Sequence, residues 1–175
     1  MGRIISPVGE LFLIFSDRGL HALLWAESVR PALPPEEHHP VFKLARLQLE
    51  EYFSGVRRVF DLPYVFQGTE FQRLAWRQLQ TIAYGRTISY REQAEQMGDQ
   101  RKARAVGMAN SRNPLPILVP CHRVVAHDGS LGGYAGGVER KRRLLRLEQK
   151  HAGGTFNSNQ SISVNRQNAT RPYMR

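Results

Sequence analysis

The spacing of the apolar residues changes near residue 67, and this change limits the possible folds more than any other feature of the chain. Between residues 3 and 26, Leu11, Leu13 and Phe15 recur at every second position, and a turn at residues 17–19 separates them from a second apolar run. Such a pattern is typical of paired strands. After residue 69 the apolar residues recur at helical spacing. We therefore expect an α/β (α+β) protein with a β-rich part first and a helical part second.

One helix is expected in the first part. Leu44, Leu47 and Phe53 recur at helical spacing, and Gly55 follows them. Glycine commonly ends a helix because it adopts the left-handed backbone conformation without a steric penalty. We expect a β-rich domain with one helix over residues 1–66, followed by a helical domain over residues 67–150.

Two capping boxes begin helices in the second part. Thr69 precedes Gln72, and Ser89 precedes Glu92, at the spacing in which each side chain bonds an amide of the other residue. The first helix should end at Gly85. Its inner face is expected to carry Phe71, Leu74, Leu79 and Ile82.

The second capping box begins a pair of short helices. One should end at Met97 and Gly98, and Asp99 can cap another that runs from about Arg101 to Ala109. Two short helices joined by a tight turn that contains glycine are a candidate helix-turn-helix. Helix pairs of this kind also occur purely as structure, so both interpretations remain open at this point.

Two short strands and a last helix are expected after this pair. The strands are residues 117–119 and 123–125, and the helix runs from Val138 to about Lys150 with three leucines on its inner side. Residues 151–175 are rich in Asn, Ser and Gln, which is typical of a polar tail. The basic residues of the helix are expected to form a solvated face, and they are Arg140, Lys141, Arg142, Arg143 and Arg146.

The positive charge is concentrated in the second part. Residues 1–68 carry 7 Lys and Arg against 8 Asp and Glu, whereas residues 69–150 carry 15 against 7. A basic region favours a polyanionic partner, and nucleic acid ranks ahead of membrane because no apolar amphipathic face accompanies the charge. A basic surface without a partner is the alternative. The first residues carry neither a secretory signal nor a membrane span, so we expect an intracellular protein without a membrane partner.

The single cysteine, Cys121, lies in the run LVPCHRVV. A lone cysteine forms no internal disulfide, so Cys121 is either an inert buried residue or a reactive thiol. A thiol becomes a nucleophile when a base or a cation stabilises its thiolate. His122 is the nearest base, but neighbours in extended backbone point to opposite faces, so we expect it to act through a water molecule. Glu148 can fix the tautomer of that imidazole.

The run PCHRVV, with NPLPILV before it and GGYAGG and RKRRLLRLE after it, resembles the active-site region of the O6-alkylguanine-DNA alkyltransferases. The similarity is nearly continuous from about Thr69 to Glu148, is loose before residue 69 and is absent from the tail. The family implies a ribonuclease H-like first domain and a winged helix-turn-helix second domain that carries the active site.

The resemblance also implies roles for individual residues. Cys121 would accept the alkyl group from guanine O6, His122 would act as its base through water, and Glu148 would polarise His122. Asn113 would tie the active-site turn together, and Tyr90 would donate a proton toward guanine N3. In the family's base pocket, the Ala135 amide would donate to guanine O6. The carbonyls of Cys121 and Val124 would accept from the exocyclic amine. The walls of the pocket would be Pro116, Tyr134 and Gly136.

On the DNA side, the resemblance makes Arg104 the side chain that replaces an extruded base in the stack. Extrusion is needed because the target atom is out of reach inside a duplex. The small residues Ala103, Ala105, Gly107 and Ala109 would allow the helix to approach the minor groove closely. The resemblance also makes Arg123 a buttress between the two domains rather than a substrate contact.

The implied activity is irreversible repair of O6-alkylguanine in double-stranded DNA, with O4-alkylthymine left open. An S-alkyl cysteine is a thioether without a good leaving group, so each molecule should act once. We expect no metal and no cofactor, a monomer with cooperative DNA binding left open, and a cytoplasmic, nucleoid-associated location, or a nuclear one in a eukaryote. A protein that binds alkylated bases without transfer is the main alternative. A cysteine hydrolase would give Arg104 no function, and a transcriptional regulator would give Cys121 no function.

Overall fold

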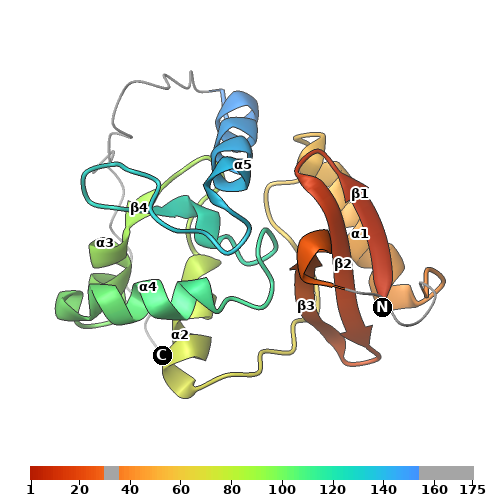
Figure 1. Ribbon diagram of the computed structural model, residues 1–175, viewed down its shortest axis with the longest axis horizontal. Coiled ribbons are helices and arrows are strands. Elements are labelled where there is room, and N and C mark those ends of the chain that lie inside the picture. The colour runs from red at the N-terminus through yellow and green to blue at the C-terminus, as the bar shows by residue number, and fades with distance from the viewer. Residues whose placement is uncertain (30–35, 154–175) are drawn as a thin grey trace.

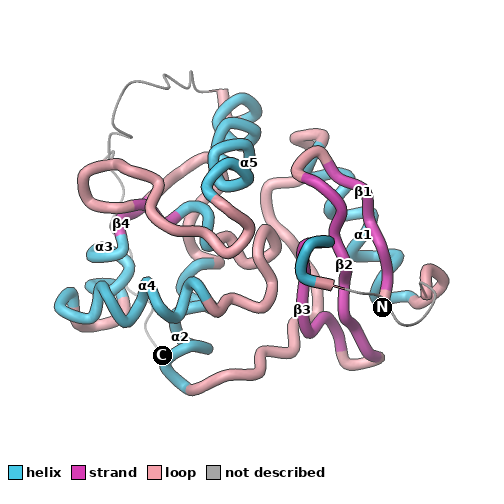
Figure 2. Tube along the Cα trace, in the orientation of Figure 1, coloured by secondary structure: helices cyan, strands magenta, loops and turns pink. Residues whose placement is uncertain are grey.

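The computed structural model describes residues 1–29 and 36–153 (Figure 1). Two parts lie side by side along the longest axis, with the strands of the first part on one side and most helices on the other (Figure 2). This arrangement confirms the predicted order of a small sheet followed by a helical region. The predicted polar tail lies outside the described residues from position 154 onwards.

Three antiparallel strands form the first part in the order β1 (Gly2–Ser6), β2 (Gly9–Ser16) and β3 (Gly19–Trp25). The predicted meander is therefore confirmed. A short 3-10 helix, η1 (Ala26–Ser28), follows the sheet. The first strand lies so close to the next helix that a Cβ atom on Gly2 would stand 2.2 Å from the ring of Phe42.

Helix α1 (Pro40–Phe53) is the helix predicted in the first part, and it packs on this sheet. Leu44 and Leu47 are 42% and 52% exposed. The buried side chains instead include two large aromatic rings, which remove more apolar area from water than the leucines would. The buried stripe of α1 is Phe42, Ala45, Gln48, Leu49 and Tyr52.

Helix α2 (Glu70–Leu79) has the predicted capping box but ends six residues before Gly85. Its buried side chains are Ala75, Trp76 and Leu79, whereas Leu74 is 47% exposed. The prediction of a longer helix was wrong because the chain tightens after Leu79: the Ile82 amide donates to the Leu79 carbonyl, three residues earlier, and the Ile82 carbonyl accepts from Arg123 instead of from an amide of a next helical turn.

The candidate helix-turn-helix consists of α3 (Tyr90–Gln96) and α4 (Ala103–Ser111). The 3-10 helix η2 (Gln100–Lys102), capped by Asp99, lies between them, so the second helix begins slightly later than predicted. Gln93 and Asn110 join the helices through a buried hydrogen bond of 2.7 Å. Ala109 was predicted to face DNA, but it is buried and its carbonyl accepts a hydrogen bond from the indole of Trp76.

The segment between α4 and the last helix contains less strand than predicted. Residues 117–119 form a turn, in which the Val119 amide donates to the Leu115 carbonyl, because Asn113 pulls both ends of the segment together. The cysteine lies in the 3-10 helix η3 (Cys121–Arg123). The short strands β4 (Ile88–Ser89) and β5 (Val124–Val125) pair in parallel, and α5 (Val138–His151) ends the described chain.

The solvated face predicted for α5 is only partly correct. Arg143 and Arg146 are exposed, but Lys141 is fully buried. The half-buried Arg140 lies against the first part of the chain: it donates to the Val8 carbonyl and its guanidinium lies 4.6 Å from the ring centroid of Trp25. These two side chains connect α5 to the rest of the molecule instead of facing solvent.

Candidate active site

Asn113 shapes the loop that carries the thiol. Its Oδ1 accepts from the Leu115 amide at 3.0 Å, and its Nδ2 donates to the Val119 carbonyl at 2.7 Å and to the Cys121 sulfur at 3.2 Å. Within this loop Ile117 has φ +76°, the only positive φ of a non-glycine residue in the described chain. A β-branched residue is strained there, and such strain persists only where the surroundings impose it. Asn113 thus links the loop conformation directly to the sulfur.

Cys121 itself is 6% exposed, at the start of η3. Burial raises the pKa of its thiol to about 11, although the hydrogen bond from Asn113 and the charge of Lys141 oppose this effect. The thiol is therefore protonated at neutral pH. It needs a base that removes its proton as the sulfur attacks.

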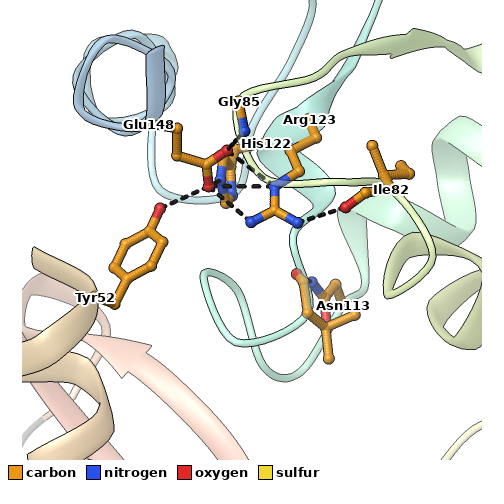
Figure 3. A network of polar contacts seen from close by, with 8 residues as sticks. Tyr52, Ile82, Gly85, Asn113, His122, Arg123 and Glu148 are labelled. Carbon is orange, nitrogen blue, oxygen red and sulfur yellow. Dashed lines mark hydrogen bonds and ion pairs between the residues drawn. The ribbon is translucent and has the colours of Figure 1, made fainter. Parts of the chain in front are cut away.

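His122 and Glu148 form the predicted contact. The His122 Nε2 lies 2.8 Å from the Glu148 Oε1, and both side chains are fully buried (Figure 3). Because an ionised carboxylate only accepts hydrogen bonds, Nε2 carries the proton. Burial lowers the pKa of His122, so the imidazole is neutral and its Nδ1 is unprotonated. The 3-10 turn replaces the extended backbone that was predicted at Cys121 and His122.

Glu148 accepts hydrogen bonds from several elements at once (Figure 3). Arg123 donates to both oxygens at 2.9 to 3.2 Å, the Gly85 amide donates to Oε2 at 2.9 Å, and the Tyr52 hydroxyl donates to Oε1 at 2.9 Å. Burial acts to raise the pKa of Glu148, but His122 and Arg123 outweigh it and lower the pKa to about 2. Glu148 is therefore a fixed anion beneath His122.

Arg123 was predicted to buttress the two domains. Its hydrogen bonds in fact go to Glu148 and to the Ile82 carbonyl, both in the second part of the chain. The side chain that reaches Glu148 from the first part is Tyr52. Arg123 and Tyr52 thus bind the same carboxylate, so the direct hydrogen bond between the two parts at this site comes from Tyr52.

Lys141 is a buried cation that sequence reasoning missed. Its Nζ donates to the carbonyls of Val124, at 2.6 Å, and Leu131. Burial lowers the pKa of Lys141 to about 8, and the thiolate form of Cys121 acts in the opposite direction. A signal was present, since Lys141, Leu144, Leu145 and Glu148 recur at helical spacing on one stripe of α5.

The structure brings the two predicted tyrosines near the thiol. Burial raises the pKa of both Tyr90 and Tyr134, and the thiolate form of Cys121 adds to this effect. A Cβ atom on Gly132 would lie 3.2 Å from the Tyr90 hydroxyl, so the glycine-rich loop passes close to this ring. Two tyrosine rings therefore lie within electrostatic reach of the sulfur.

The remaining pocket residues lie in two places. Pro116 is buried in the Asn113 loop, whereas Ala135 is exposed and Gly136 is buried. A Cβ atom on Gly136 would lie 2.5 Å from the ring of Trp25, which in turn contacts Tyr134 edge-on at 6.2 Å between ring centroids. Trp25, which sequence reasoning also missed, supports this wall from the first part of the chain.

The predicted DNA-facing residues lie on the exposed side of α4. Arg104 and Ala105 are exposed, and Ala103 and Gly107 are half-buried. A shallow hollow lies on this helix, and both Tyr90 and Arg104 line it. The other residues that line the hollow are Ala103, Gly107, Met108 and Ser111.

Two negative observations apply to the described ranges, 1–29 and 36–153. No group of three or more His, Cys, Asp or Glu residues converges there as a metal site would require. None of the helices in these ranges is both long and apolar enough to cross a membrane.

Comparison with known proteins accounts for both parts of the chain. Residues 2–65 match the ribonuclease-like domain of 6-O-methylguanine DNA methyltransferase, and residues 70–150 match the DNA binding domain of the same family. A methylated-DNA–protein-cysteine methyltransferase of Mycobacterium bovis is 51% identical over 151 residues, which cover 85% of this chain and 92% of the relative. The enzyme of the same name from Methanosarcina barkeri is 43% identical over 151 residues, covering 85% and 96% of the two chains.

A solved structure agrees with this assignment. The crystal structure of Mycobacterium tuberculosis OGT in complex with DNA superimposes with a TM-score of 0.78 at 44% identity, over 85% of this chain and 92% of that one. Sequence similarity, fold and the order of the two matched domains agree along the described chain. The chain belongs to the 6-O-methylguanine DNA methyltransferase family.

Proposed function

We propose that this protein repairs DNA by transferring an alkyl group directly from O6-alkylguanine to Cys121, once per molecule. The observation that carries the proposal is the position of the thiol. It is buried beside a neutral histidine whose Nε2 proton is held by an ionised carboxylate, in the part of the chain that matches a DNA binding domain. The names of the relatives support the same activity.

The transfer is a displacement at the alkyl carbon. The Cys121 sulfur forms a bond to this carbon, the bond from carbon to guanine O6 breaks, and its electron pair stays on the base. The thiol proton passes through a water molecule to the free Nδ1 of His122, and Glu148 stabilises the imidazolium that forms. Tyr90 donates a proton toward guanine N3 and neutralises the departing base. The product is a thioether, which explains the single turnover.

The base is held mainly by backbone groups in this proposal. The Ala135 amide donates to O6, and the carbonyls of Cys121 and Val124 accept from the exocyclic amine. The Val124 carbonyl already accepts from Lys141, and a second lone pair remains for the base. Pro116, Tyr134 and Gly136 form the pocket walls.

DNA is bound through the exposed side of α4 in the minor groove. Arg104 enters the stack in place of the extruded base, while Ala103, Ala105 and Gly107 allow close approach of the helix. The hollow lined by both Tyr90 and Arg104 supports this proposal, because it places the proposed proton donor and the proposed inserted side chain on one surface.

We further propose that the chain has two domains, residues 1–66 and 67–150, that it is a monomer, and that it has a cytoplasmic, nucleoid-associated location.

Mass spectrometry of the intact protein, with peptide mapping, tests the transfer. The protein is mixed with excess duplex that contains one O6-methylguanine. We expect one methylene equivalent per chain, located on Cys121, and no further gain with time. The Cys121→Ala variant should gain no mass but should bind duplex within about twofold of the wild type, because phosphate contacts dominate DNA affinity.

Two results would contradict the proposal. Transfer by Cys121→Ala would exclude the mechanism. Tight binding to the lesion without any mass change in the wild type would mean that the chain recognises alkylated bases without transfer.

A further inference from the structure

We propose that Tyr52, a residue of the first part of the chain, is a positioning residue of the active site: its hydroxyl holds the Glu148 carboxylate that orients His122. The inference rests on the proposed function, because it concerns the proton transfer from Cys121 to His122 in the same site. It goes beyond that function by making α1, which lies outside the DNA binding domain, a part of the proton-transfer machinery.

The contact joins two distant parts of the chain. Tyr52 and Glu148 are 96 positions apart, and the hydroxyl donates to Oε1 at 2.9 Å. Figure 3 shows the phenol extending from α1 toward the carboxylate of Glu148, which projects from α5 and lies beside His122 and Arg123. Tyr52 and Glu148 are both fully buried, so water does not screen the contact.

The hydroxyl is a permanent donor. Burial raises the pKa of Tyr52 well above its ordinary value, and the charge of Glu148 adds to this shift. The phenol therefore keeps its proton at neutral pH and donates it in a hydrogen bond to the carboxylate. No other hydrogen bond of this hydroxyl is found among the described residues, so its donor capacity is directed at Glu148.

Packing does not require the hydroxyl. The ring of Tyr52 lies 5.3 Å from the rings of Phe53 and Phe60 and 5.9 Å from that of Tyr84, measured between centroids. A phenylalanine ring would keep these contacts. The polar group can therefore be removed while the aromatic packing remains.

Removing this donor has a predictable electrostatic effect on the histidine. Oε1 of Glu148 accepts from Tyr52, His122 and Arg123. When one donor is lost, the carboxylate becomes more basic and stabilises the doubly protonated imidazole more strongly. His122 then keeps an extra proton at higher pH, and a protonated Nδ1 cannot accept the proton of the thiol.

Other charged and titratable groups also face this cluster. Arg123 lies on η3, Lys141 on the same helix as Glu148, and Cys121 next to His122 in the chain. Tyr84 contributes a ring on which the guanidinium groups of Arg58 and Arg123 rest. None of these groups changes when Tyr52 becomes phenylalanine, so the substitution isolates one neutral donor.

The test compares Tyr52→Phe with Tyr64→Phe. The Tyr64 hydroxyl is also buried but has no hydrogen-bond partner in the described chain, so this control removes the same atom without touching Glu148. The transfer rate to Cys121 is measured from pH 5 to 9 with free O6-benzylguanine as the probe, which avoids any effect on DNA binding. For Tyr52→Phe we expect the acidic limb of the pH–rate profile to move upward by on the order of half a pH unit or more.

A second substitution at position 52 is expected to move the acidic limb in the opposite direction. Replacing Tyr52 by 3-fluorotyrosine makes the phenol a stronger donor with almost no change in shape, so the acidic limb should move downward. Tyr64→Phe should leave the limb in place. A uniform loss of rate at every pH in Tyr52→Phe, an unchanged profile, or shifts of the same sign in both position-52 variants would overturn the inference.

One readout is independent of transfer. Nitrogen-15 NMR of the imidazole in unreacted protein should show His122 protonated at Nε2 in the wild type, and should show a raised pKa of this ring in Tyr52→Phe. If the wild type fails to accept an alkyl group while this shift is present, the proposed function fails and the positioning role stands. If transfer occurs but neither the ring nor the profile shifts, the positioning role alone fails.

Discussion

At the scale of single residues, Glu148 decides how the site responds to acid. Its pKa is lowered to about 2 in the folded protein, from about 4.5 in an unfolded chain. The pKa of His122 is also lowered, from about 6.5. For both groups the unfolded chain binds more protons than the folded one as the pH falls, so acid destabilises the fold.

We expect the free energy of unfolding to fall first below pH 6.5, through His122, and then between about pH 4.5 and 2, through Glu148. The share of Glu148 at neutral pH is about 3 to 4 kcal/mol, because its pKa falls from 4.5 to about 2 on folding and each pKa unit is worth about 1.4 kcal/mol. Urea denaturation at several pH values measures this dependence. Glu148→Gln should lower stability at neutral pH and flatten the lower part of the curve, whereas the exposed control Glu95→Gln should keep its shape. A curve that stays steep in Glu148→Gln would show that other carboxylates cause the acid sensitivity.

At the scale of elements, local hydrogen bonds decide where the helices begin, and tertiary contacts decide which of their faces are buried. Both capping boxes form as predicted because their bonds lie within four residues. The buried face of α2 was predicted less well, because periodicity alone does not decide which of two apolar stripes meets a partner. The exposed side of α4, with Arg104, is left free by the packing of its other side on Trp76 and Gln93.

Arg104→Ala should reduce repair of O6-methylguanine in duplex DNA by at least about tenfold, since extruding a base requires a few kcal/mol. Reaction with free O6-benzylguanine should change little, because that base needs no extrusion. The control Arg18→Ala removes the same charge from the exposed turn between β2 and β3. Equal losses with both substrates, or equal losses in both variants, would show that Arg104 acts through general charge or through folding.

At the scale of the whole molecule, the nearly neutral first part contacts the basic second part through several hydrogen bonds and ring contacts. The Leu23 amide donates to the Pro114 carbonyl beside the thiol loop, Tyr52 reaches Glu148, and Arg140 lies between the two parts. Arg140 also donates to Glu27 and rests on Trp25, which supports the Gly136 wall. The first part thus shapes the site from several sides.

Arg140→Ala should lower the free energy of unfolding by about 1 to 3 kcal/mol, because it loses partly buried hydrogen bonds and a cation–π contact. It should also increase the solvent exposure of Trp25, seen as a red shift of its fluorescence. Arg143→Ala removes an arginine three residues later whose partner is exposed, and it should leave both measurements unchanged. Equal effects of the two substitutions would mean that α5 contributes only its overall charge.

The sequence alone determined the order of strands and helices, the capped helix starts, and the candidate group of Cys121, His122, Asn113 and Glu148. These features depend on local hydrogen bonding, on hydrophobic period, or on a motif whose residues are adjacent or recognisable by family resemblance. Only the tertiary structure decided that residues 117–119 form a strained turn, that Lys141 is buried, and that Tyr52 shares the carboxylate of Glu148. Such contacts join residues far apart in the chain, and their energies depend on burial and on the direction of side chains, which no local pattern specifies.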